Sequence, residues 1–478
     1  MTRSHLSALT FATALSAALI GFALPSVAAP APSINWKQQE PEILRHYRAL
    51  VQLDTSSPPG NETRAVNYLK GVFEKEGIPV KTFALDPARA NLVARIEGNG
   101  SKRPILLMSH TDVVGVQREK WPVDPFGAVQ SEGYVWGRGT RDDKDNLTAN
   151  LMVMLLAKRS SMALDRDIIF LAESGEEADP AGVGIPFMVS RHFDEIDAEY
   201  ALAEGGGGVL QDGRVTQMSI QTSEKVPRRF RLVATGTSGH GSVPRLDNPL
   251  THLSAAVAKI GAFETPMRLN ETTRAYFGKL AEIAPPEGAQ RYRQLLSAQP
   301  PASLQRYFAE REPQHYSMLR TSIVPTILKA GVGPNVIPSQ AEATFDVRAL
   351  PDEDIPRLFA EVARLIGDAA VKVEPITTNL RPVSPPSGLD SDMYRALVAV
   401  SGEMFPGAAV LPTMMTGATD MAQLRAKGIQ AYGIGPVSTD ADTINYGAHS
   451  DVERLLESEL YRFVEFTWRA TTAVAAKK

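Results

Sequence analysis

The sequence predicts an α/β protein: a mixed, largely parallel sheet with helices on both faces, plus a smaller inserted α+β domain of ferredoxin-like order. Two observations lead to this fold class. Short apolar runs, typical of buried strands, alternate with helical patterns up to residue 225 and again after residue 380. Between them, the order of expected elements becomes β-α-β-β-α-β. A chain of 478 residues is also longer than one core usually serves, which favours two domains.

Each element of the larger domain rests on a local pattern. Residues 62–76 place apolar side chains on one helical face, and Gly77 follows as a stop signal. A second helix is expected over residues 147–156, and an amphipathic helix over residues 453–473. Buried strands are expected at residues 91–96, 105–108, 134–136, 168–172, 200–203 and 429–434. We assign this domain to residues 36–225 and 381–478.

The inserted domain is assigned to residues 226–380. Its expected strands are residues 229–235, 323–330, 341–347 and 370–375, and its expected helices are residues 250–263 and 352–366. Residues 268–319, rich in proline, glutamine, arginine and aromatic side chains, separate the first helix from the second strand. This insertion predicts helices of its own, but the sequence assigns it no role.

The N-terminus has the pattern of a targeting segment. Arg3 and His5 precede an apolar run over residues 6–24, and small residues at 26–29 offer a cleavage site. A membrane anchor is the alternative, but the small residues and the proline-rich linker after them favour a signal peptide, residues 1–29. We therefore expect a periplasmic or secreted protein with no stable membrane anchor after cleavage. The absence of cysteine excludes disulfides and thiolate metal sites.

The charge balance argues against one class of partner. The chain has 50 lysine and arginine residues against 54 acidic residues, which gives a net charge of -4. A nucleic-acid-binding protein needs a basic stripe, and this near-balance does not indicate one. We therefore expect no nucleic-acid partner, although a local charged pocket remains compatible with the composition.

Several expected strands lead into histidine or acidic side chains. His110 follows one apolar run directly, and Asp142 follows another through the glycines on either side of an arginine. Glu176 and Glu177 follow a third run, and Glu204 follows a fourth. Because ligands gather at the carboxyl ends of strands in open α/β sheets, we expect these side chains to meet.

Taken singly, each of these residues has a purely structural explanation. A histidine after a strand is usually part of a surface turn, and adjacent glutamates usually form a solvated face. Together with His449 near the C-terminus, they supply two imidazoles and several carboxylates, a set that suits zinc or a similar divalent ion. Of two adjacent glutamates in such a loop, one can bind metal while the other moves protons, as metal-assisted hydrolysis requires.

The sequence resembles a known family, the di-zinc exopeptidases and deacylases that include acetylornithine deacetylase, glutamate carboxypeptidase and aminoacylase (peptidase family M20). The resemblance spans about residues 36–470 and keeps the order and spacing of the family's motifs. These are SHTDVV at 109–114, Trp121 with DPF at 124–126, GRGTRDDK at 137–144, EE at 176–177, EGG at 204–206, GHGSVP at 239–244, NVIP at 335–338, DVR at 346–348 and GATD at 417–420.

The resemblance implies two Zn²⁺ ions per chain, with Co²⁺ or Mn²⁺ as substitutes, and five metal ligands. Asp142 would bridge the two ions, roughly 3.5 Å apart in such hydrolases, and its peptide bond to Asp143 would be cis. The other ligands would divide two to each ion, with His110 and Glu204 on one and Glu177 and His449 on the other.

The resemblance also implies three residues that act in catalysis. Glu176 would be the general base, which takes a proton from the attacking water and returns it to the leaving amine. Asp112 would orient His110. His240, in the inserted domain, would help to stabilise the oxyanion, often across a dimer interface.

Other matching positions would contact the substrate: His240, Asn335, Arg348, Gly417 and Thr419. An arginine suits bidentate binding of a terminal carboxylate. The inserted domain would then serve both as a lid and as the surface of a homodimer.

Two positions depart from the family's pattern. Asp145 stands where the family usually has glycine, and would either disturb the start of the helix or face solvent. Ser450 also replaces a glycine, next to His449, and is a mild change. Neither departure removes an expected metal ligand.

The predicted function is therefore that of an exported metal-dependent exopeptidase, carboxypeptidase- or dipeptidase-like, that cleaves an amide bond next to a free carboxylate. The first alternative is an N-acyl-amino-acid deacylase of the aminoacylase kind, because both substrates present an amide and a carboxylate. A minor alternative is a catalytically inactive homologue used for binding, which predicts a missing ligand or base. Peptides or N-acyl amino acids are the expected substrates.

Overall fold

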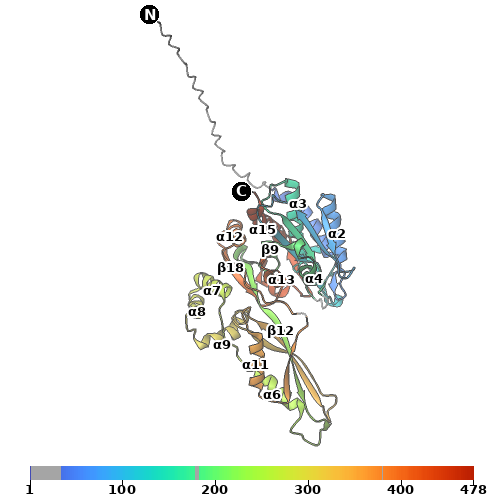
Figure 1. The fold of residues 1–478 in the computed structure, drawn as a ribbon, viewed down its shortest axis with the longest axis vertical. Coiled ribbons are helices and arrows are strands. Elements are labelled where there is room, and N and C mark those ends of the chain that lie inside the picture. Colours follow the sequence, from blue (N-terminus) through green and yellow to red (C-terminus); the bar gives the residue numbers. More distant parts are fainter. Residues whose placement is uncertain (2–33, 178–181, 379, 478) are drawn as a thin grey trace.

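The structure is a computed structural model that describes residue 1 and residues 34–177, 182–378 and 380–477. Apart from Met1, the predicted signal peptide lies outside the described residues. Figure 1 shows a larger domain, which contains the C-terminal helix α15 (Glu457–Ala475), and a second domain that extends from it along strand β12 (Val226–Thr235). In the described part of the chain, no helix combines the length and the apolar character that crossing a membrane requires.

The larger domain is built on one sheet with the strand order β2-β3-β8-β4-β9-β19-β11-β10-β20, and β18 pairs with β11 outside this path. Its central strands β8, β4, β9 and β19 are parallel neighbours, whereas β2, β3 and β8 pair antiparallel. The predicted mixed, largely parallel sheet is confirmed. The strands are β2 (Val80–Phe83), β3 (Asn91–Ile96), β4 (Ile105–His110), β8 (Ile168–Glu173), β9 (Tyr200–Ala203), β10 (Gly207–Gln211), β11 (Arg214–Glu224), β18 (Ala409–Met415), β19 (Gln430–Gly433) and β20 (Val437–Thr439).

Helices cover both faces of this sheet, so its central strands are buried on both sides. Along β4, Ile105 and Leu107 pack into one core while Leu106 and Met108 pack into the other. This alternation follows from the two-residue period of a strand and explains the uninterrupted apolar run. The helices are α1 (Trp36–Val51), α2 (Thr63–Lys75), α3 (Lys144–Ser160), α4 (Ile185–Arg191), α5 (Phe193–Ile196), α12 (Asp392–Met404), α13 (Met421–Ala426), α14 (Asp440–Asn445) and α15.

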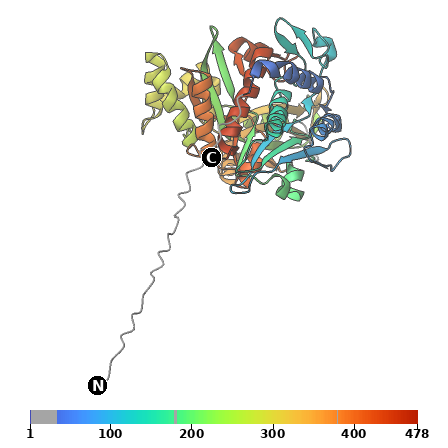
Figure 2. The ribbon, with the colours of Figure 1, turned by 90° about the horizontal axis from the view of Figure 1, so that it is seen from above.

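The two ends of the larger domain pack against each other. Helix α15 lies against α1, α3 and α12 (Figure 2). A small sheet in the order β21-β7-β6 adds a second connection, because β21 comes from the C-terminal segment and β7 from the segment before Asp142. Its strands are β6 (Val129–Ser131), β7 (Tyr134–Trp136) and β21 (Arg454–Leu456), and the short pieces nearby are β1 (Ser56–Ser57), β5 (Val113–Val114) and the 3₁₀ turn η1 (Arg118–Lys120).

The second domain is a four-stranded antiparallel sheet in the order β14-β16-β12-β17, with two helices on one face. The sequence order β-α-β-β-α-β with this strand order is the ferredoxin-like arrangement that the sequence predicts. Phe230 and Phe345 stack at 4.8 Å in its core. The further elements are α6 (Pro249–Gly261), β14 (Ser322–Ala330), β16 (Gln340–Ala349), α11 (Ile355–Ile366), β17 (Val371–Ile376) and a small ladder of β13 (Gly239–His240) with β15 (Val336–Ile337).

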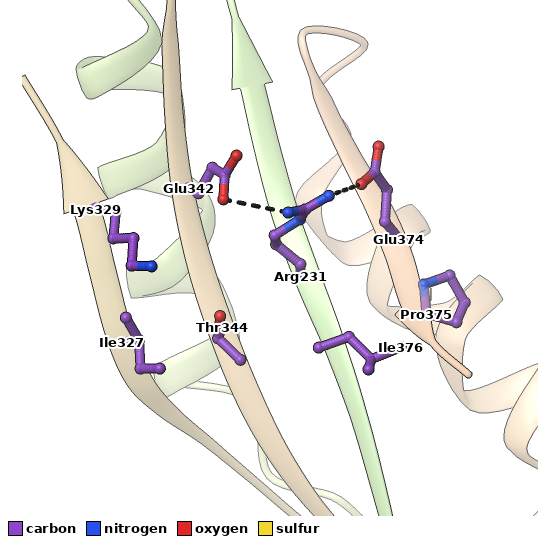
Figure 3. A pocket seen from close by; sticks show the side chains of 8 residues that line it. All are labelled: Arg231, Ile327, Lys329, Glu342, Thr344, Glu374, Pro375 and Ile376. Atoms are coloured by element: carbon purple, nitrogen blue, oxygen red, sulfur yellow. Dashed lines mark hydrogen bonds and ion pairs between the residues drawn. The ribbon is translucent and has the colours of Figure 1, made fainter. Parts of the chain in front are cut away.

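The other face of this second sheet is exposed. Arg231 stands there between Glu342 and Glu374, with N···O distances of 3.4 Å and 2.8 Å, over a shallow pocket (Figure 3). Ile327 and Leu328 on β14 are 48% and 65% exposed. An open sheet face of this kind, with apolar side chains at its edge strand, is the sort of surface that proteins use for pairing.

The insertion at residues 268–319 forms a small helical unit of its own, as predicted. Its aromatic core includes Phe277, Tyr292 and Phe308, and it packs against Leu411 and Met414 of β18. Figure 1 shows α7 beside β18, with α8 and α9 continuing the helical unit on the flank of the molecule. The helices are α7 (Glu271–Ile283), α8 (Pro286–Leu295), α9 (Ala302–Arg311) and α10 (Pro313–Met318).

Two chain crossings connect the larger and the second domain. Lys225 alone separates β11 from β12, and its buried ammonium donates to the carbonyl and hydroxyl oxygens of Ser317 and to Ser322. The second crossing runs from β17 to α12. The predicted domain limits at residues 225/226 and 380/381 stay a prediction.

Candidate metal centre

Three adjacent strands deliver their C-terminal residues to one point. His110 is the last residue of β4, Glu204 comes directly after β9, and Glu176 and Glu177 come shortly after β8. Because these strands are parallel neighbours, their carboxyl ends open on the same edge of the sheet. The sheet topology therefore explains why residues far apart in sequence meet here.

Asp142 lies at the centre of this group. Its two carboxylate oxygens face two imidazoles, with Oδ1 2.8 Å from His110 Nε2 and Oδ2 3.0 Å from His449 Nε2. His449 Nε2 also lies 3.0 Å from Glu177 Oε1. The peptide bond between Asp142 and Asp143 is cis, as the resemblance implies.

Two overlapping sets of side chains place their ligand atoms within 4.8 Å of one another. One set is His110, Asp142 and Glu177, and the other is His110, Glu176 and Glu204. With His449, the structure thus gathers all five residues that the sequence predicts as metal ligands, and Glu176 beside them. Their division between two ions stays a prediction.

The electrostatics of this group fit bound cations. Burial raises the pKa of Glu204 well above its usual range, and the nearby charge of Asp142 raises it further. Hydrogen bonds to Asp142 and Glu177 raise the pKa of His449 to about 10. Carboxylates crowded in this way need positive charge to stay ionised, and oxygen and imidazole ligands at such separations suit divalent ions.

The neighbours of His110 fix which of its nitrogens can bind a metal. Its Nδ1 lies 3.0 Å from the carbonyl oxygen of Asp112, which can only accept, so Nδ1 carries the hydrogen and Nε2 keeps its lone pair. The Asp112 carbonyl is closer to Nδ1 than the Asp112 carboxylate, which lies 3.5 Å away. The role of Asp112 in orienting His110 stays a prediction.

The Asp112 carboxylate holds the loop that carries both glutamates. Its oxygens accept from the backbone N–H groups of Gly175, Glu176 and Glu177 at 2.9, 3.1 and 3.1 Å. Burial opposes the charge of Asp112, but the hydrogen bond and charge of His110, together with the backbone N–H groups of Glu177 and Glu176, outweigh burial and lower the pKa of Asp112. One buried carboxylate thus links the β4 and β8 loops.

Glu176 faces an arginine that the sequence analysis missed. Arg381 Nη2 lies 2.7 Å from Glu176 Oε1, and Arg381 Nη1 lies 3.0 Å from Asp420 Oδ1. Burial raises the pKa of Glu176 to about 8, against the opposing effect of Arg381. Asp420 belongs to the GATD motif, but Arg381 lies in a linker without any recognisable motif, so the sequence offered no signal for it.

A buried ion pair connects the Asp142 loop to the His449 loop. Arg138 Nη1 lies 2.6 Å from Glu453 Oε2, and Glu453 also accepts from the Arg141 backbone N–H at 2.7 Å. The arginine of the GRG segment is thus a structural support. Glu453 was missed because it stands at the start of the expected helix 453–473, where an acidic side chain is usually solvated; the helix in fact begins at Glu457.

Of the two departures from the family's pattern, Asp145 lies inside the protein and Ser450 is half-buried. Asp145 is fully buried in the first turn of α3, so the expectation that it could face solvent is wrong. Neither of its carboxylate oxygens has a hydrogen-bond partner among the described residues, and burial raises the pKa of Asp145 to about 7. The helix nevertheless begins normally at Lys144. The buried hydroxyl of Ser450 also lacks a partner among the described residues.

The predicted substrate-contacting residues are spread over two places. His240 bonds to Ser242 at 2.7 Å, and Asn335 accepts from the Gly241 backbone N–H at 2.7 Å, so His240 and Asn335 are neighbours in the second domain. None of the hydrogen bonds described for these residues reaches the metal cluster. Their roles toward a substrate stay predictions.

The remaining substrate candidates have structural partners. Arg348 Nε bonds to Asp346 at 2.7 Å. Thr419 donates its backbone N–H and its hydroxyl to the buried carboxylate of Glu224, at 3.0 and 2.8 Å. At Gly417, two residues earlier, an added Cβ would fit and would contact only the Met415 side chain. Contacts of these residues with a substrate stay predictions.

Comparison with known proteins decides the family. The family model described as "Peptidase family M20/M25/M40" matches residues 106–471. The chain belongs to this family. It is a metallopeptidase-family hydrolase, and the family resemblance seen in the sequence motifs is confirmed.

Individual relatives differ in what their names describe. The chain is 30% identical over 401 residues to "Probable carboxypeptidase S-like 2" of Dictyostelium discoideum, covering 81% of this chain and 71% of that protein. It is 28% identical over 412 residues to the human "N-fatty-acyl-amino acid synthase/hydrolase PM20D1", covering 81% and 79%. The solved M20 carboxypeptidase Sso-CP2 of Sulfolobus solfataricus matches with a TM-score of 0.67 at 19% identity, over 91% of this chain and 99% of that one, and shows the same fold.

Proposed function

We propose that this protein is an exported exopeptidase, carboxypeptidase- or dipeptidase-like, that uses two zinc ions to hydrolyse an amide bond next to a free carboxylate. The observation that carries the proposal is the convergence of five ligand-type side chains, Asp142 among them, with the extra carboxylate of Glu176 beside them. Co²⁺ and Mn²⁺ are the expected substitutes for zinc, because the ligands are nitrogen and oxygen.

Divalent ions held by these residues would supply a water of lowered pKa and polarise the substrate carbonyl. Glu176 then takes the proton of the attacking water and returns it to the leaving amine. The raised pKa of Glu176, about 8 because of burial, suits a group that must first accept a proton and then release it. Asp112 keeps Glu176 in place through the backbone of its loop.

Substrate binding needs groups from the second domain as well. We assign His240 to oxyanion stabilisation and Arg348 to the substrate carboxylate, with Asn335, Gly417 and Thr419 as further contacts. His240 and Asn335 would come from the second copy of a homodimer that pairs through the second domain. The exposed apolar side chains of β14 and the open sheet face of Figure 3 support this pairing.

The alternative is an N-acyl-amino-acid deacylase, and the name of the human relative favours it. Both reactions use the same amide hydrolysis, so the metal centre does not separate them. A panel of dipeptides and N-acyl amino acids, matched in the residue that carries the free carboxylate, separates the two substrate classes. Higher kcat/KM on dipeptides supports the peptidase, and turnover only of acyl substrates would refute it.

A non-catalytic binding role is the least favoured alternative, since no predicted ligand or base is replaced. Glu176→Gln tests it together with the assignment of the base. The variant should keep its metal content and lose at least about 10²-fold in kcat. Retained activity would refute the assigned base, and lost metal would indicate that the roles of Glu176 and Glu177 are exchanged.

Export rests on the pattern of the first 29 residues. Expression of the full chain with a C-terminal tag, followed by fractionation and N-terminal sequencing of the product, tests it directly. A product that begins near residue 30 outside the cytoplasm is expected. An intact N-terminus in the cytoplasm would contradict export.

A further inference from the structure

Arg381 contacts the proposed general base at two atoms. Its Nη2 lies 2.7 Å from the carboxylate oxygen Oε1 of Glu176 and 3.4 Å from the backbone carbonyl oxygen of the same residue. Its Nη1 donates to Asp420 at 3.0 Å. The guanidinium is thus anchored by Asp420 on one side and holds both the side chain and the main chain of Glu176 on the other.

Arg381 also lies on a connection between the two domains. It belongs to the crossing from β17 to α12, and its own carbonyl oxygen accepts from Arg228 Nη1 at 3.0 Å. Arg228 is part of β12, which begins directly after the other crossing at Lys225. The same residue therefore contacts the base through its side chain and the lid strand through its main chain.

The contact with Arg381 offsets part of an unfavourable environment for the Glu176 carboxylate. Burial opposes the charge of Glu176, and the nearby carboxylates of Asp420 and Glu177 oppose it further. Arg381, whose side chain is 21% exposed, is the nearby arginine that favours it. A guanidinium fork also fixes direction, which a single ammonium group does less well.

We propose that Arg381 is a positioning residue: it fixes the carboxylate of Glu176 for proton transfer and couples that carboxylate to both crossings between the catalytic domain and the lid. This inference rests on the proposed function, in which Glu176 is the general base. In that function Arg381 acts through Glu176 and is assigned no contact with the substrate or the attacking water. Movement of the lid relative to the catalytic domain thereby changes the placement of the base.

Arg381→Ala is the direct test. A misplaced catalytic group costs about 10²-fold, so kcat should fall by that factor, while KM changes by less than about threefold and the metal content stays that of the unchanged protein. Arg381→Lys should lose less, about tenfold, because it keeps the charge but not the fork. Added guanidinium ion should restore part of the kcat of Arg381→Ala. A rise in KM with little change in kcat would overturn the inference and would instead indicate that Arg381 binds substrate.

A second readout needs no activity. In metal-free protein, backbone hydrogen exchange in residues 168–177 should be faster in Arg381→Ala, since the Glu176 loop loses its anchor. Arg395→Ala is the matched control, because Arg395 forms an exposed pair with Asp392 at 2.6 Å on the following helix. Equal exchange in Arg381→Ala and Arg395→Ala would count against the inference.

The link to the lid has its own test. Arg228→Met removes the donor to the Arg381 carbonyl and should lower kcat by a smaller factor than Arg381→Ala. The double variant should be no slower than Arg381→Ala alone, because both changes act through one contact. If the fold-losses in kcat of the two single variants multiply in the double variant, the coupling is refuted. An active Glu176→Gln variant would refute the proposed base itself, whereas an inactive Glu176→Gln with a fully active Arg381→Ala would refute only the role of Arg381.

Discussion

Replacing Arg138 with methionine should destabilise the protein and loosen two metal-binding loops at once. Arg138 lies in the loop just before Asp142, and its partner Glu453 lies in the loop just after His449. The pair is almost fully enclosed, with side-chain exposures of 2% and 0%, and its N···O distance is 2.6 Å. Methionine keeps most of the volume but leaves the Glu453 charge buried without its arginine.

The magnitude follows from this burial. Removing one partner of a buried ion pair costs about 3–5 kcal/mol, because an uncompensated charge remains inside. For a protein of this size, whose unfolding entropy is about 1 kcal/mol/K, that corresponds to a fall in melting temperature of about 3–5 °C. The exposed pair of Arg118 and Asp124, with side chains 58% and 57% exposed, is the control, and Arg118→Ala should cost less than about 1 kcal/mol.

The stability lost in Arg138→Met should also depend on pH in a definite direction. Burial raises the pKa of Glu453 above its usual value, and Arg138 opposes that rise. Without Arg138 the folded-state pKa climbs further, and a raised carboxyl pKa costs stability as pH rises from the unfolded towards the folded value. Arg138→Met should therefore be most destabilised near pH 8 and less so near pH 5, where Glu453 can take a proton.

Urea unfolding of Arg138→Met, Glu453→Gln and the double variant measures these effects, with metal content recorded for each. The double variant should be more stable than Arg138→Met alone, because no unpaired charge remains. Strictly additive losses, or an Arg138→Met variant no weaker than Arg118→Ala, would refute the reasoning.

Three further predictions concern Asp145, the metal centre and the edge strand β14. In metal-free protein, Asp145→Asn should be more stable than the unchanged protein at pH 8 but not at pH 4. Burial raises the pKa of Asp145 to about 7, so the cost of the Asp145 charge appears only as pH rises towards that value. Urea unfolding at both pH values checks this, and equal stability of the two proteins at pH 8 would contradict it. Removal of metal with a chelator should abolish hydrolysis and lower the melting temperature, and zinc, cobalt or manganese should restore both; full activity after verified metal removal would exclude the proposed chemistry. Leu328→Asp should shift the protein towards monomer in sedimentation experiments, since Leu328 is 65% exposed on the edge strand β14; an unchanged dimer would place the interface elsewhere.

Much of the fold could be predicted because the patterns were local. The run at residues 105–108 is apolar on both faces, since helices cover both sides of the sheet, and such a strand needs no tertiary information to recognise. The ferredoxin-like order could be predicted for the same reason, from alternation on one face of β16 (Gln340–Ala349) and an amphipathic α11 (Ile355–Ile366). The packing of the 268–319 insertion against β18 could not, because it depends on a surface formed by distant residues.

Some residues of the candidate site could likewise be predicted from the sequence, and others could not. Its ligands stand at strand ends, where position in sequence predicts position in space, so His110, Glu177 and Glu204 could be grouped in advance. Arg381 and Glu453 could not, because their roles come only from burial beside Glu176 and Arg138. The burial of Asp145 was also not predictable, since helix starts are usually solvated.

The central claim is that Asp142 is shared by two ions. Anomalous diffraction from crystals grown with zinc, measured on both sides of the zinc edge, tests it most directly. We predict two peaks about 3.5 Å apart with Asp142 between them, one next to His110 and Glu204 and the other next to Glu177 and His449. A single peak, or two peaks of which Asp142 contacts only one, would contradict the claim.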